Sequence, residues 1–440
     1  MPDAGTAGQR IALFTIGTQG DIRPCLALGR GLQQLGHSVR VVTSLNFETW
    51  IRRQGLDFAP LTADFQALLT AERELADQGL DMRRMAALFR TRFEEWAGSW
   101  AAEGLQASAG ASLLLGVGNS TLLAQALAEV RGLPFVRVQL QPLTPSRHLP
   151  PMLLAGRRYP PPLTLAAYQL LRLLVWYVMQ PAINRRVRPQ LGLRPYPWHG
   201  PYFSETGLRA RVLYGFSRHV LPPPPDWPAS AKVCGYWFLD EPDWRPDSEL
   251  QKFLDAGEPP VYVGFGSMVS GDAETFTRQI IDSLRRSGRR VVLATGWGGT
   301  SAPPGRLDEQ LLVIREAPHD GLLPLMAAAV HHGGAGTTAA VVRAGIPSVV
   351  VPFYGDQPFW ARRLQAIGVA GAPLSRVEVG QGALVPALAR ILQPAMRKSA
   401  AALARQLAAE DGVATAIGQL RAWDLLSGGP ARPVAAGATA

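Results

Sequence analysis

Residues 331–357, which read HHGGAGTTAAVVRAGIPSVVVPFYGDQ, constrain the fold more than any other stretch of this sequence. The glycine run after the two histidines suits a tight turn and a close approach of the backbone to a ligand. Residues 337–342 predict a helix that ends near Gly345, with Pro347 just beyond, and residues 348–352 predict a short β-branched strand. A glycine loop that opens a helix leaves backbone N–H groups and the positive end of the helix dipole facing outward. The stretch therefore predicts an anion site, with phosphate as the natural guest.

The same order of strand, glycine loop and helix is expected in both halves of the chain. Residues 11–16 predict a buried strand, residues 17–24 a glycine-containing loop, and residues 39–43 the next strand, after a helix that ends at Gly36. The second half repeats this order from residue 261 onward. Such units place parallel strands side by side, with ligands at the carboxyl ends of the strands. The glycine spacing does not match a dinucleotide fingerprint, so a nicotinamide-dependent enzyme is not expected.

A chain of 440 residues is too long for one ordinary core, so two domains are expected. Four consecutive prolines at 222–225 predict a stiff connector between them. The expected parts are a first domain over 1–225, a linker over 226–246, a second domain over 247–412, a last helix over 413–427 and a flexible tail over 428–440.

Composition narrows the classes of partner. The net charge of +10 would suit a nucleic acid, but the only lysines are Lys232, Lys252 and Lys398 and the arginines are scattered, so no nucleic-acid partner is expected. Cys25 and Cys234 lie far apart and lack the spacing of a metal site. The first ten residues lack the apolar core of a secretory signal, so a cytoplasmic location is expected.

Residues 163–179 predict a helix that is apolar on nearly all sides, with Arg172 in its middle and Pro181 at its end. It is short for a membrane span. The favoured interpretation is a buried helix that lines an internal pocket, and the alternative is a helix that lies on a membrane surface. Both interpretations predict an apolar partner.

The 331–357 stretch resembles the donor-binding signature of the GT-B, family-one glycosyltransferases, which use nucleotide-activated sugars. It is most similar to that of sterol glucosyltransferases and vancomycin-group antibiotic glycosyltransferases, where HHGGAGTT, AGIP and DQ occur in this order. The resemblance covers about the first forty residues, patches near Pro181 and most of 261–369. It implies an α/β protein with two doubly wound, Rossmann-like domains that face each other across a cleft. The acceptor would bind the first domain and the nucleotide sugar the second, and the last helix would cross back to the first domain.

Several residues are candidates for binding the diphosphate of the donor. An imidazole, backbone donors and hydroxyls are expected at Gly20, Gly266, Ser267, His332, Gly334, Gly336 and Thr337. The resemblance places a diphosphate contact at His332, for which a purely structural histidine is the alternative. No Asp-x-Asp motif lies near these loops, so no metal cofactor is expected, and the helix dipole, the histidine and the hydroxyls would take the place of a divalent ion.

The resemblance also indicates which residues would bind the sugar and the base of the donor. Asp356 and Gln357 would hold hexose hydroxyls, and the alternative for Asp356 is a cap of the helix that follows. The backbone at Ala317 would read uracil or thymine. Trp297 is the candidate for stacking on the base, and a packed core tryptophan is nearly as good an interpretation.

Asp21 is the candidate general base. An acceptor hydroxyl must lose a proton as its oxygen attacks the sugar, and a positioned carboxylate can take that proton. In the resemblance, Gln19-Gly20-Asp21 stands where plant members carry Gln-Gly-His. A helix N-terminus lowers the pKa of a carboxylate, which argues against a strong base here. A plain helix cap is the alternative.

The resemblance, together with these residues, implies an inverting glycosyltransferase that would move a hexose from a UDP-sugar to a hydroxyl of a lipophilic natural product, polyketide or terpenoid, and form a β-glycoside. UDP-glucose is the preferred donor, and a dTDP-sugar stays open. The alternatives are a sterol or membrane glycolipid glucosyltransferase in peripheral contact with a membrane, a sugar-nucleotide epimerase, and a non-catalytic sugar-nucleotide-binding partner protein.

Overall fold

The computed structural model describes residues 8–65, 67–68, 82–154, 159–203, 210–266, 273–296 and 305–427. The candidate residues Ser267 and Trp297 and the predicted tail, residues 428–440, lie outside the described residues.

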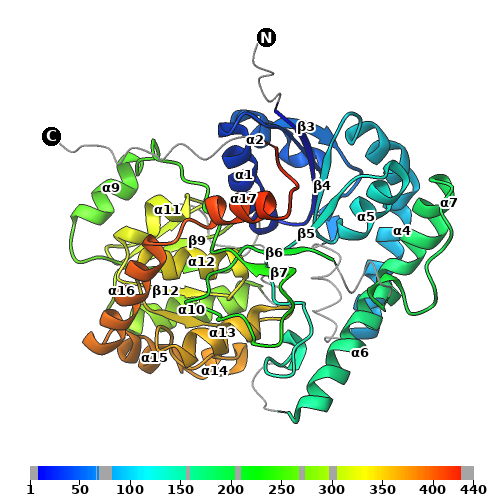
Figure 1. Ribbon diagram of the computed structural model, residues 1–440. Coiled ribbons are helices and arrows are strands. Elements are labelled where there is room, and N and C mark those ends of the chain that lie inside the picture. Colours follow the sequence, from blue (N-terminus) through cyan, green and yellow to red (C-terminus); the bar gives the residue numbers. More distant parts are fainter. Residues whose placement is uncertain are drawn as a thin grey trace.

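The N-terminal half is built around a seven-stranded parallel sheet with strand order β3-β2-β1-β4-β5-β6-β7 (Figure 1). The strands are β1 (Arg10–Ile16), β2 (Ser38–Thr43), β3 (Asp57–Pro60), β4 (Leu113–Gly118), β5 (Phe135–Gln139), β6 (Val212–Tyr214) and β7 (Ala231–Val233). Helices cover both faces, which is why strands such as β1 are apolar and buried along their length. The described helices are α1 (Gln19–Gln34), η1 (Leu45–Phe47), α2 (Glu48–Arg53), α4 (Met82–Ala107), α5 (Thr121–Arg131), η2 (Met152–Leu154), α6 (Pro161–Gln180), η3 (Pro181–Val187), α7 (Arg188–Gln190) and η4 (Pro201–Phe203).

The C-terminal half contains a six-stranded sheet with strand order β10-β11-β9-β8-β12-β13, parallel except for β10. Its strands are β8 (Val261–Gly264), β9 (Val291–Ala294), β10 (Gly305–Arg306), β11 (Leu311–Ile314), β12 (Ala328–His331) and β13 (Ser348–Val350). The helices are α9 (Ser248–Asp255), α10 (Ala273–Arg286), α11 (His319–Leu322), η5 (Leu323–Leu325), α12 (Ala335–Ala344), α13 (Gln357–Ala366), α14 (Arg376–Gly380), α15 (Leu384–Ile391), α16 (Pro394–Ala408) and α17 (Gly412–Ala422). The predicted pair of Rossmann-like α/β domains is confirmed.

The boundary between the domains differs from the expected one. β7 pairs in parallel with β6, so the first sheet includes residues 231–233, which lie inside the expected linker 226–246. A three-residue strand is too short to show a hydrophobic pattern, which is why the sequence did not reveal it.

The last helix, α17, packs on α1 in the N-terminal half (Figure 1). Ile417 of α17 belongs to the same buried cluster as the core of the first sheet. The approach is close because Gly31 of α1 has no side chain: a Cβ there would lie 2.3 Å from Val413 Cγ1. The helix covers Gly412–Ala422, and the apolar residues 425–426 continue the contact beyond it.

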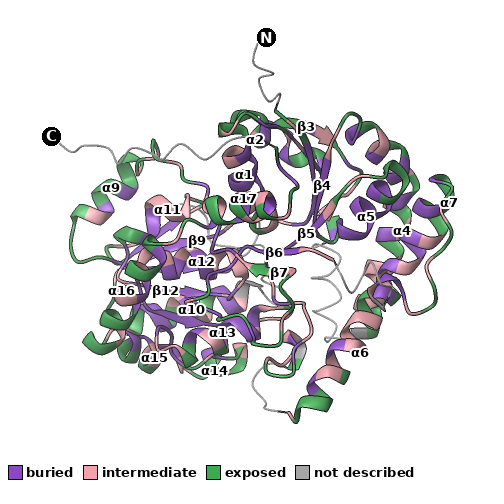
Figure 2. Cartoon of the chain, viewed as in Figure 1, coloured by how far each residue is buried: buried purple, intermediate pink, exposed green. Residues whose placement is uncertain are grey.

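The interpretation of residues 163–179 as a buried helix needs correction. α6 buries only Thr164, Tyr168, Trp176 and Met179, and Figure 2 shows most of its length as exposed or partly exposed. Among the described residues, Pro161–Gln190 is the one segment long and apolar enough to cross a membrane. Its most apolar window has a mean hydropathy of 1.3 and is only 22% buried. Apolar composition on all sides cannot show which side faces a core.

Candidate active site

The anion site predicted at residues 331–337 is built by glycines between β12 and α12. Gly333 has φ +89°, in the left-handed region that favours glycine, and a Cβ there would lie 2.7 Å from Val350 Cγ1. Gly334 is the N-cap of α12, and a Cβ there would lie 2.5 Å from His332 Nε2. The loop therefore lies close to β13 on one side and to the His332 ring on the other.

The first turn of α12 has the features of an anion site. By helix geometry, the N–H groups of residues 335–337 have no partner within the helix. No described side chain caps this end of α12, and the partly exposed Thr337 adds a hydroxyl group beside it. Free N–H groups and the helix dipole together favour a bound phosphate.

Three histidines lie near this loop. His331 is fully buried and its Nδ1 accepts the N–H of Gly333 (3.1 Å), so its role is to hold the turn. Burial lowers the pKa of His331 to about 3, and burial lowers the pKa values of His319 and His332 to about 4. All three rings are therefore neutral at pH 7, and His332 can offer one N–H to a phosphate as a hydrogen-bond donor. The residue-type pattern did not single out His319, whose Nε2 lies 3.1 Å from the Tyr262 hydroxyl.

Two further glycines of this domain, Gly266 and Gly296, lie near His332. Gly266 follows β8, and a Cβ there would lie 3.6 Å from His332 Cε1. Gly296 follows β9, and a Cβ there would lie 2.8 Å from the Gly266 carbonyl oxygen. Ala317 follows β11 and packs, partly buried, against the core of this domain. The carboxyl ends of the strands thus bring these candidates to one edge of the sheet.

Asp356 stands at the N-cap position of α13 but makes no cap hydrogen bond. Its Oδ2 instead accepts the indole N–H of Trp360 (3.0 Å) and the amide N–H of Gln141 (3.4 Å), which follows β5 in the first domain. Burial, together with the nearby charge of Asp21, raises the pKa of Asp356 to about 6. The alternative of a plain helix cap therefore does not describe this carboxylate. Trp360 and Gln141 are site residues that the sequence did not indicate.

Gln357 is 2% exposed, and its side-chain oxygen already accepts hydrogen bonds from the backbone. Oε1 accepts the backbone N–H of Phe353 (2.8 Å) and of Tyr354 (3.4 Å), which closes the loop ahead of α13. Of the side-chain amide, only the NH₂ group is left for a sugar hydroxyl.

Asp21 lies at the third position of α1 and folds back over the start of the helix. Its Oδ2 accepts the backbone N–H of Thr18 (2.8 Å) and the Thr18 hydroxyl (3.2 Å), a capping box. This geometry needs Gly17, because a Cβ there would lie 2.2 Å from Asp21 Oδ2. Burial raises the pKa of Asp21 above its ordinary value, and this effect outweighs the hydrogen bonds from Thr18. The pKa of Asp21 is therefore raised, not lowered as its place at a helix N-terminus led us to expect. The contact with Thr18 that a helix cap predicts is also present.

The two domains meet where these residues gather. A Cβ on Gly336, in the first turn of α12, would lie 3.5 Å from the Cα of Gly20, in the first turn of α1. Asp21 and Asp356 are close enough for the charge of one to raise the pKa of the other. The structure thus brings together the candidate base, the candidate sugar ligand and the anion site.

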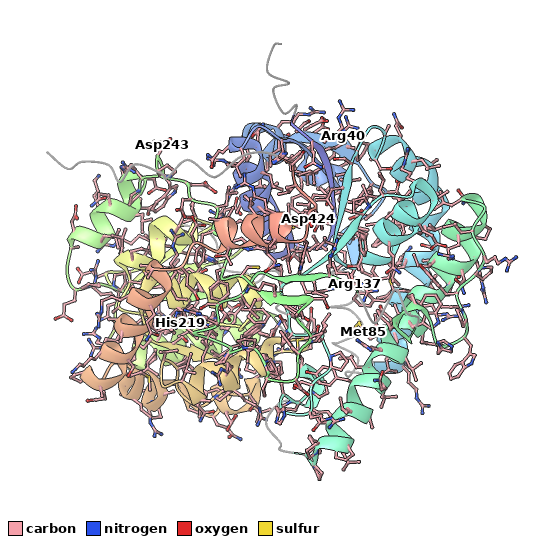
Figure 3. The ribbon with its side chains drawn as sticks, in the orientation of Figure 1. Arg40, Met85, Arg137, His219, Asp243 and Asp424 are labelled. Atoms are coloured by element: carbon pink, nitrogen blue, oxygen red, sulfur yellow. The ribbon has the colours of Figure 1, made fainter. Side chains whose placement is uncertain are left out.

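Polar side chains lie on β5 and just beyond its end in the first domain. Arg137 and Gln139 are alternate residues of β5 and so lie on one face of the sheet, and Gln141 follows the end of the strand. Arg137, labelled near the middle of Figure 3, is buried and donates to Gln125 Oε1 (3.0 Å). Gln141 at the other end reaches Asp356.

The affinity of the site for a sugar nucleotide is expected to fall about tenfold between pH 7 and pH 5, because at one unit below a pKa of about 6 only about one molecule in ten has an ionised Asp356. Calorimetric titration with UDP-glucose across this range checks the prediction.

The ionisation of Asp356 affects the stability of the fold in the opposite direction. Its folded pKa lies above the value of about 3.9 for an exposed aspartate, so its stabilising contribution is complete below about pH 4 and is lost as the pH rises through about 6. The Asp356→Asn variant should lose both pH dependences, and a pH-independent affinity in the unmodified chain would contradict the prediction.

Two family models match the chain. The glycosyltransferase family 28 N-terminal domain matches residues 11–142, and the erythromycin biosynthesis protein CIII-like C-terminal domain matches residues 299–422. A sterol 3-beta-glucosyltransferase of Arabidopsis thaliana is 31% identical over 415 residues, which cover 93% of this chain and 67% of that relative. The chain belongs to the GT-B, family-one glycosyltransferases.

The chain spans a smaller part of its fungal relatives. A sterol 3-beta-glucosyltransferase of Leptosphaeria maculans is 35% identical over 374 residues, which cover 82% of this chain but only 25% of that relative. The solved glycosyltransferase of kitacinnamycin has the same fold, with a TM-score of 0.69, 18% identity and coverage of 94% of this chain and 98% of that one. A calicheamicin glycosyltransferase gives a TM-score of 0.64 at 17% identity, with the same coverage. The predicted family and the GT-B fold are confirmed.

Proposed function

We propose that this glycosyltransferase moves a hexose from a UDP-sugar to a hydroxyl of a lipophilic acceptor, with inversion to a β-glycoside. The observation that carries the proposal is the meeting of Asp21 with Asp356 and the first turn of α12 at the contact of the two domains. A base, a sugar ligand and a diphosphate site are the three parts that a single displacement requires.

In the proposed reaction, the acceptor oxygen attacks the anomeric carbon while Asp21 takes the hydroxyl proton. The bond between the anomeric carbon and the diphosphate oxygen breaks, and that oxygen keeps the electron pair. The first turn of α12, Thr337 and His332 then stabilise the negative charge on the leaving UDP. Because burial raises the pKa of Asp21, its carboxylate is a better proton acceptor than an exposed aspartate.

Asp356 supports a hydroxylated hexose as the transferred group. Its carboxylate is held by Trp360 and Gln141, so it is fixed in place to accept hydrogen bonds from neighbouring sugar hydroxyls. The relatives from Arabidopsis thaliana and Leptosphaeria maculans are called sterol 3-beta-glucosyltransferases, which favours UDP-glucose. Two structural neighbours are complexes with thymidine diphosphate, so a dTDP-sugar is the second candidate. The proposed diphosphate site uses backbone N–H groups, a hydroxyl and a neutral imidazole, and it needs no metal ion.

A panel of nucleotide sugars tests the proposal. UDP-glucose at 100 times its dissociation constant should stabilise the folded chain by about 2.7 kcal/mol and raise its melting temperature, and GDP-sugars should not. Transfer to a hydroxylated lipophilic acceptor should then continue in the presence of EDTA. If no UDP- or dTDP-sugar shifts the melting temperature, the donor site is wrong. Binding without transfer to any acceptor would favour the non-catalytic sugar-nucleotide-binding protein, and isomerisation of the donor without an acceptor would favour an epimerase.

A sterol or other membrane lipid is the second candidate for the acceptor, and α6 is the observation that favours it. Leu163, Leu170, Leu174 and Tyr177 recur on one face of this helix, with 48–59% of each side chain exposed. Beyond its C-terminal end, the exposed Arg185 and Arg186 share one carboxylate, Glu94, at 3.7 and 3.9 Å. An apolar face beside surplus positive charge suits an anionic lipid surface.

The chain is therefore expected to sediment with vesicles that contain phosphatidylglycerol, and the double variant Leu170→Glu/Leu174→Glu to bind them at least ~10-fold more weakly. Burying each leucine is worth ~1.5–3 kcal/mol, and 1.4 kcal/mol is a factor of ten. Leu45→Glu is the matched control, because Leu45 is 64% exposed on η1, away from α6. Equal vesicle binding by all variants, or no binding with full activity on a dissolved aglycone, would instead favour a soluble natural product.

A further inference from the structure

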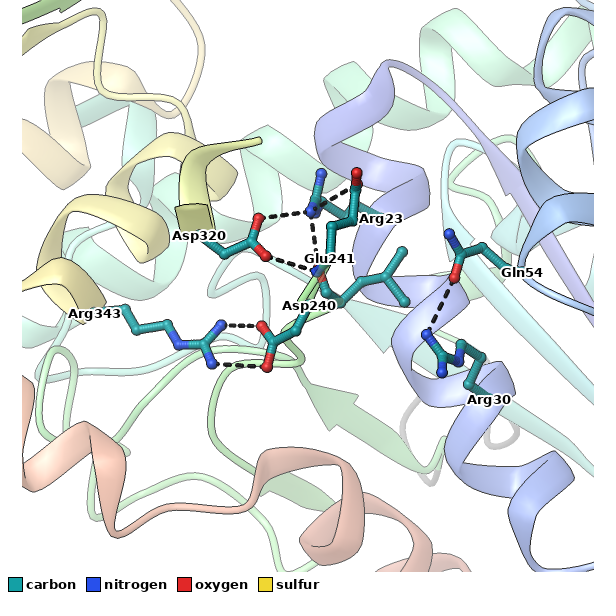
Figure 4. Close-up of polar contacts among 8 residues, drawn as sticks. Arg23, Arg30, Gln54, Asp240, Glu241, Asp320 and Arg343 are labelled. Carbon is teal, nitrogen blue, oxygen red and sulfur yellow. Dashed lines mark hydrogen bonds and ion pairs between the residues drawn. The ribbon is translucent and has the colours of Figure 1, made fainter. Parts of the chain in front are cut away.

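Arg23 lies on α1 two residues after Asp21 and reaches the second half of the chain (Figure 4). Its Nη2 donates to the carbonyl oxygen of Leu239 (2.8 Å) and to Asp320 Oδ1 (3.0 Å), and lies 3.1 Å from Glu241 Oε1. Asp320 belongs to α11 of the second domain, and residues 239–241 belong to the segment that joins the domains. One guanidinium therefore ties the helix that carries Asp21 to the donor-binding half.

Asp320, which pairs with Arg23, is itself held in place by a hydrogen bond. Its Oδ2 accepts the backbone N–H of Glu241 (2.7 Å), and its side chain is only 16% exposed. The residue before it, His319, is hydrogen-bonded to Tyr262 of β8 (3.1 Å). The carboxylate is therefore fixed to the framework of the second domain rather than held on a free loop.

Residues 239–241 also connect α1 to α12. The carboxylate of Asp240 accepts two hydrogen bonds from Arg343 in the last turn of α12, one of them at 2.9 Å (Figure 4). The first turns of the same two helices touch at Gly20 and Gly336. α1 and α12 are thus joined twice, once at the candidate active site and once through this short segment.

We infer that Arg23 is a positioning residue for glycosyl transfer: its tie to Asp320 and residues 239–241 holds α1 against the second domain, so that Asp21 stays beside the bound donor. This inference rests on the proposed role of Asp21 as the general base. A misplacement of about 1 Å in a reacting group can lower a rate ~100-fold. A merely stabilising ion pair would change the melting temperature and leave kcat unchanged.

Arg30 offers a matched control on the same helix. It donates to Gln54 Oε1 (3.2 Å) within the first domain (Figure 4). Its charge helps to lower the pKa of Asp240, but among the described residues it makes no hydrogen bond or ion pair to the second domain. Arg23→Ala is expected to lower kcat ~10- to 100-fold with the affinity for UDP-glucose unchanged, and Arg30→Ala to keep the original kcat. Arg23→Lys should recover part of the rate, because an ammonium group can still pair with Asp320. Equal losses in the two alanine variants, or a loss confined to donor affinity, would overturn the inference.

A distance measurement tests the tie without any substrate. Nitroxide labels on Arg53→Cys in α2 and Arg390→Cys in α15 report on the two domains from exposed positions, and the native Cys25 and Cys234 are buried. Arg23→Ala should broaden the distribution of distances between the labels, and Arg30→Ala should not. An unchanged distribution in Arg23→Ala would overturn the inference. If the original chain transferred no sugar, the proposed function would fail, and the distances would still decide whether Arg23 holds the domains together.

Discussion

Replacing Asp21 with Asn is expected to lower kcat by ~10²–10⁴-fold, the usual contribution of a positioned general base, and to leave the affinity for the donor unchanged. The amide cannot take the proton of the acceptor hydroxyl. Its oxygen can still accept the two hydrogen bonds that Thr18 donates to Asp21 at 2.8 and 3.2 Å, so the first turn of α1 should keep its shape. Initial rates and calorimetric titration with UDP-glucose separate the two effects.

A second aspartate provides the control for this substitution. Asp247 caps α9 by accepting the N–H groups of Glu249 and Leu250, and an asparagine can do the same. Asp247→Asn should therefore keep both the fold and the rate. An unchanged kcat in Asp21→Asn would show that another group takes the proton. A loss of donor binding in Asp21→Asn would show that the carboxylate serves the donor instead.

The pH profile distinguishes the base from a structural carboxylate. A general base acts when ionised, and burial raises the pKa of Asp21, so kcat/KM should fall as the pH drops through that raised value. Asp356, with a pKa of about 6, contributes to the same limb. Removing the charge at Asp21 should also lower the pKa of Asp356, because that charge raises it in the original chain. The low-pH limb of donor binding in Asp21→Asn is therefore expected to move to lower pH.

The shape of the loop between β12 and α12 could be predicted because it follows from residue type. Only glycine fits readily at Gly333, with φ +89°, and at Gly345, which ends α12 with φ +70°. These positions fix a turn before the helix and a cap after it, whatever the rest of the chain does. The loop at Gly17 and Asp21 is similar, since the carboxylate folds over a backbone that lacks a Cβ.

Contacts between distant segments could not be predicted in this way. Gln141 reaches Asp356 across 215 residues of chain, and Arg23 reaches Asp320 across 297. Nothing in the local pattern of either segment requires its partner. Burial reverses the expected direction of the Asp21 pKa for the same reason, because the desolvation depends on tertiary packing.

The sequence also did not show which helices and strands are buried. α6 is apolar on several faces, and periodicity cannot tell a face that packs on a core from one that is exposed. The strand β12, with the sequence AAVH, was not among the predicted strands. Two of its four residues are alanine, which is depleted in strands. That strand nevertheless sits between β8 and β13, because its small side chains fit a buried position in a parallel sheet.

Gly333→Ala is expected to combine a large loss of stability with a loss of donor binding. The left-handed backbone at φ +89° costs a side chain ~1–3 kcal/mol. The new Cβ would also lie 2.7 Å from Val350 Cγ1 and 3.2 Å from the carbonyl oxygen of Gln357, an overpacking worth another ~1–3 kcal/mol. Relief of that contact must move β13, the start of α13 or the loop itself. Each of these movements shifts the anion site relative to Asp356.

Gly36→Ala isolates the backbone contribution to this effect. Gly36 has nearly the same φ, +88°, but a Cβ there meets no atom within 4 Å, and it lies at the far end of α1 from the site. Urea unfolding should show a loss of about 1–3 kcal/mol for Gly36→Ala and up to about twice that for Gly333→Ala. Calorimetry should show UDP-glucose bound at least ~10-fold more weakly, equivalent to ~1.4 kcal/mol, by Gly333→Ala alone. Equal stability losses together with unchanged donor binding would mean that the loop between β12 and α12 does not hold the nucleotide.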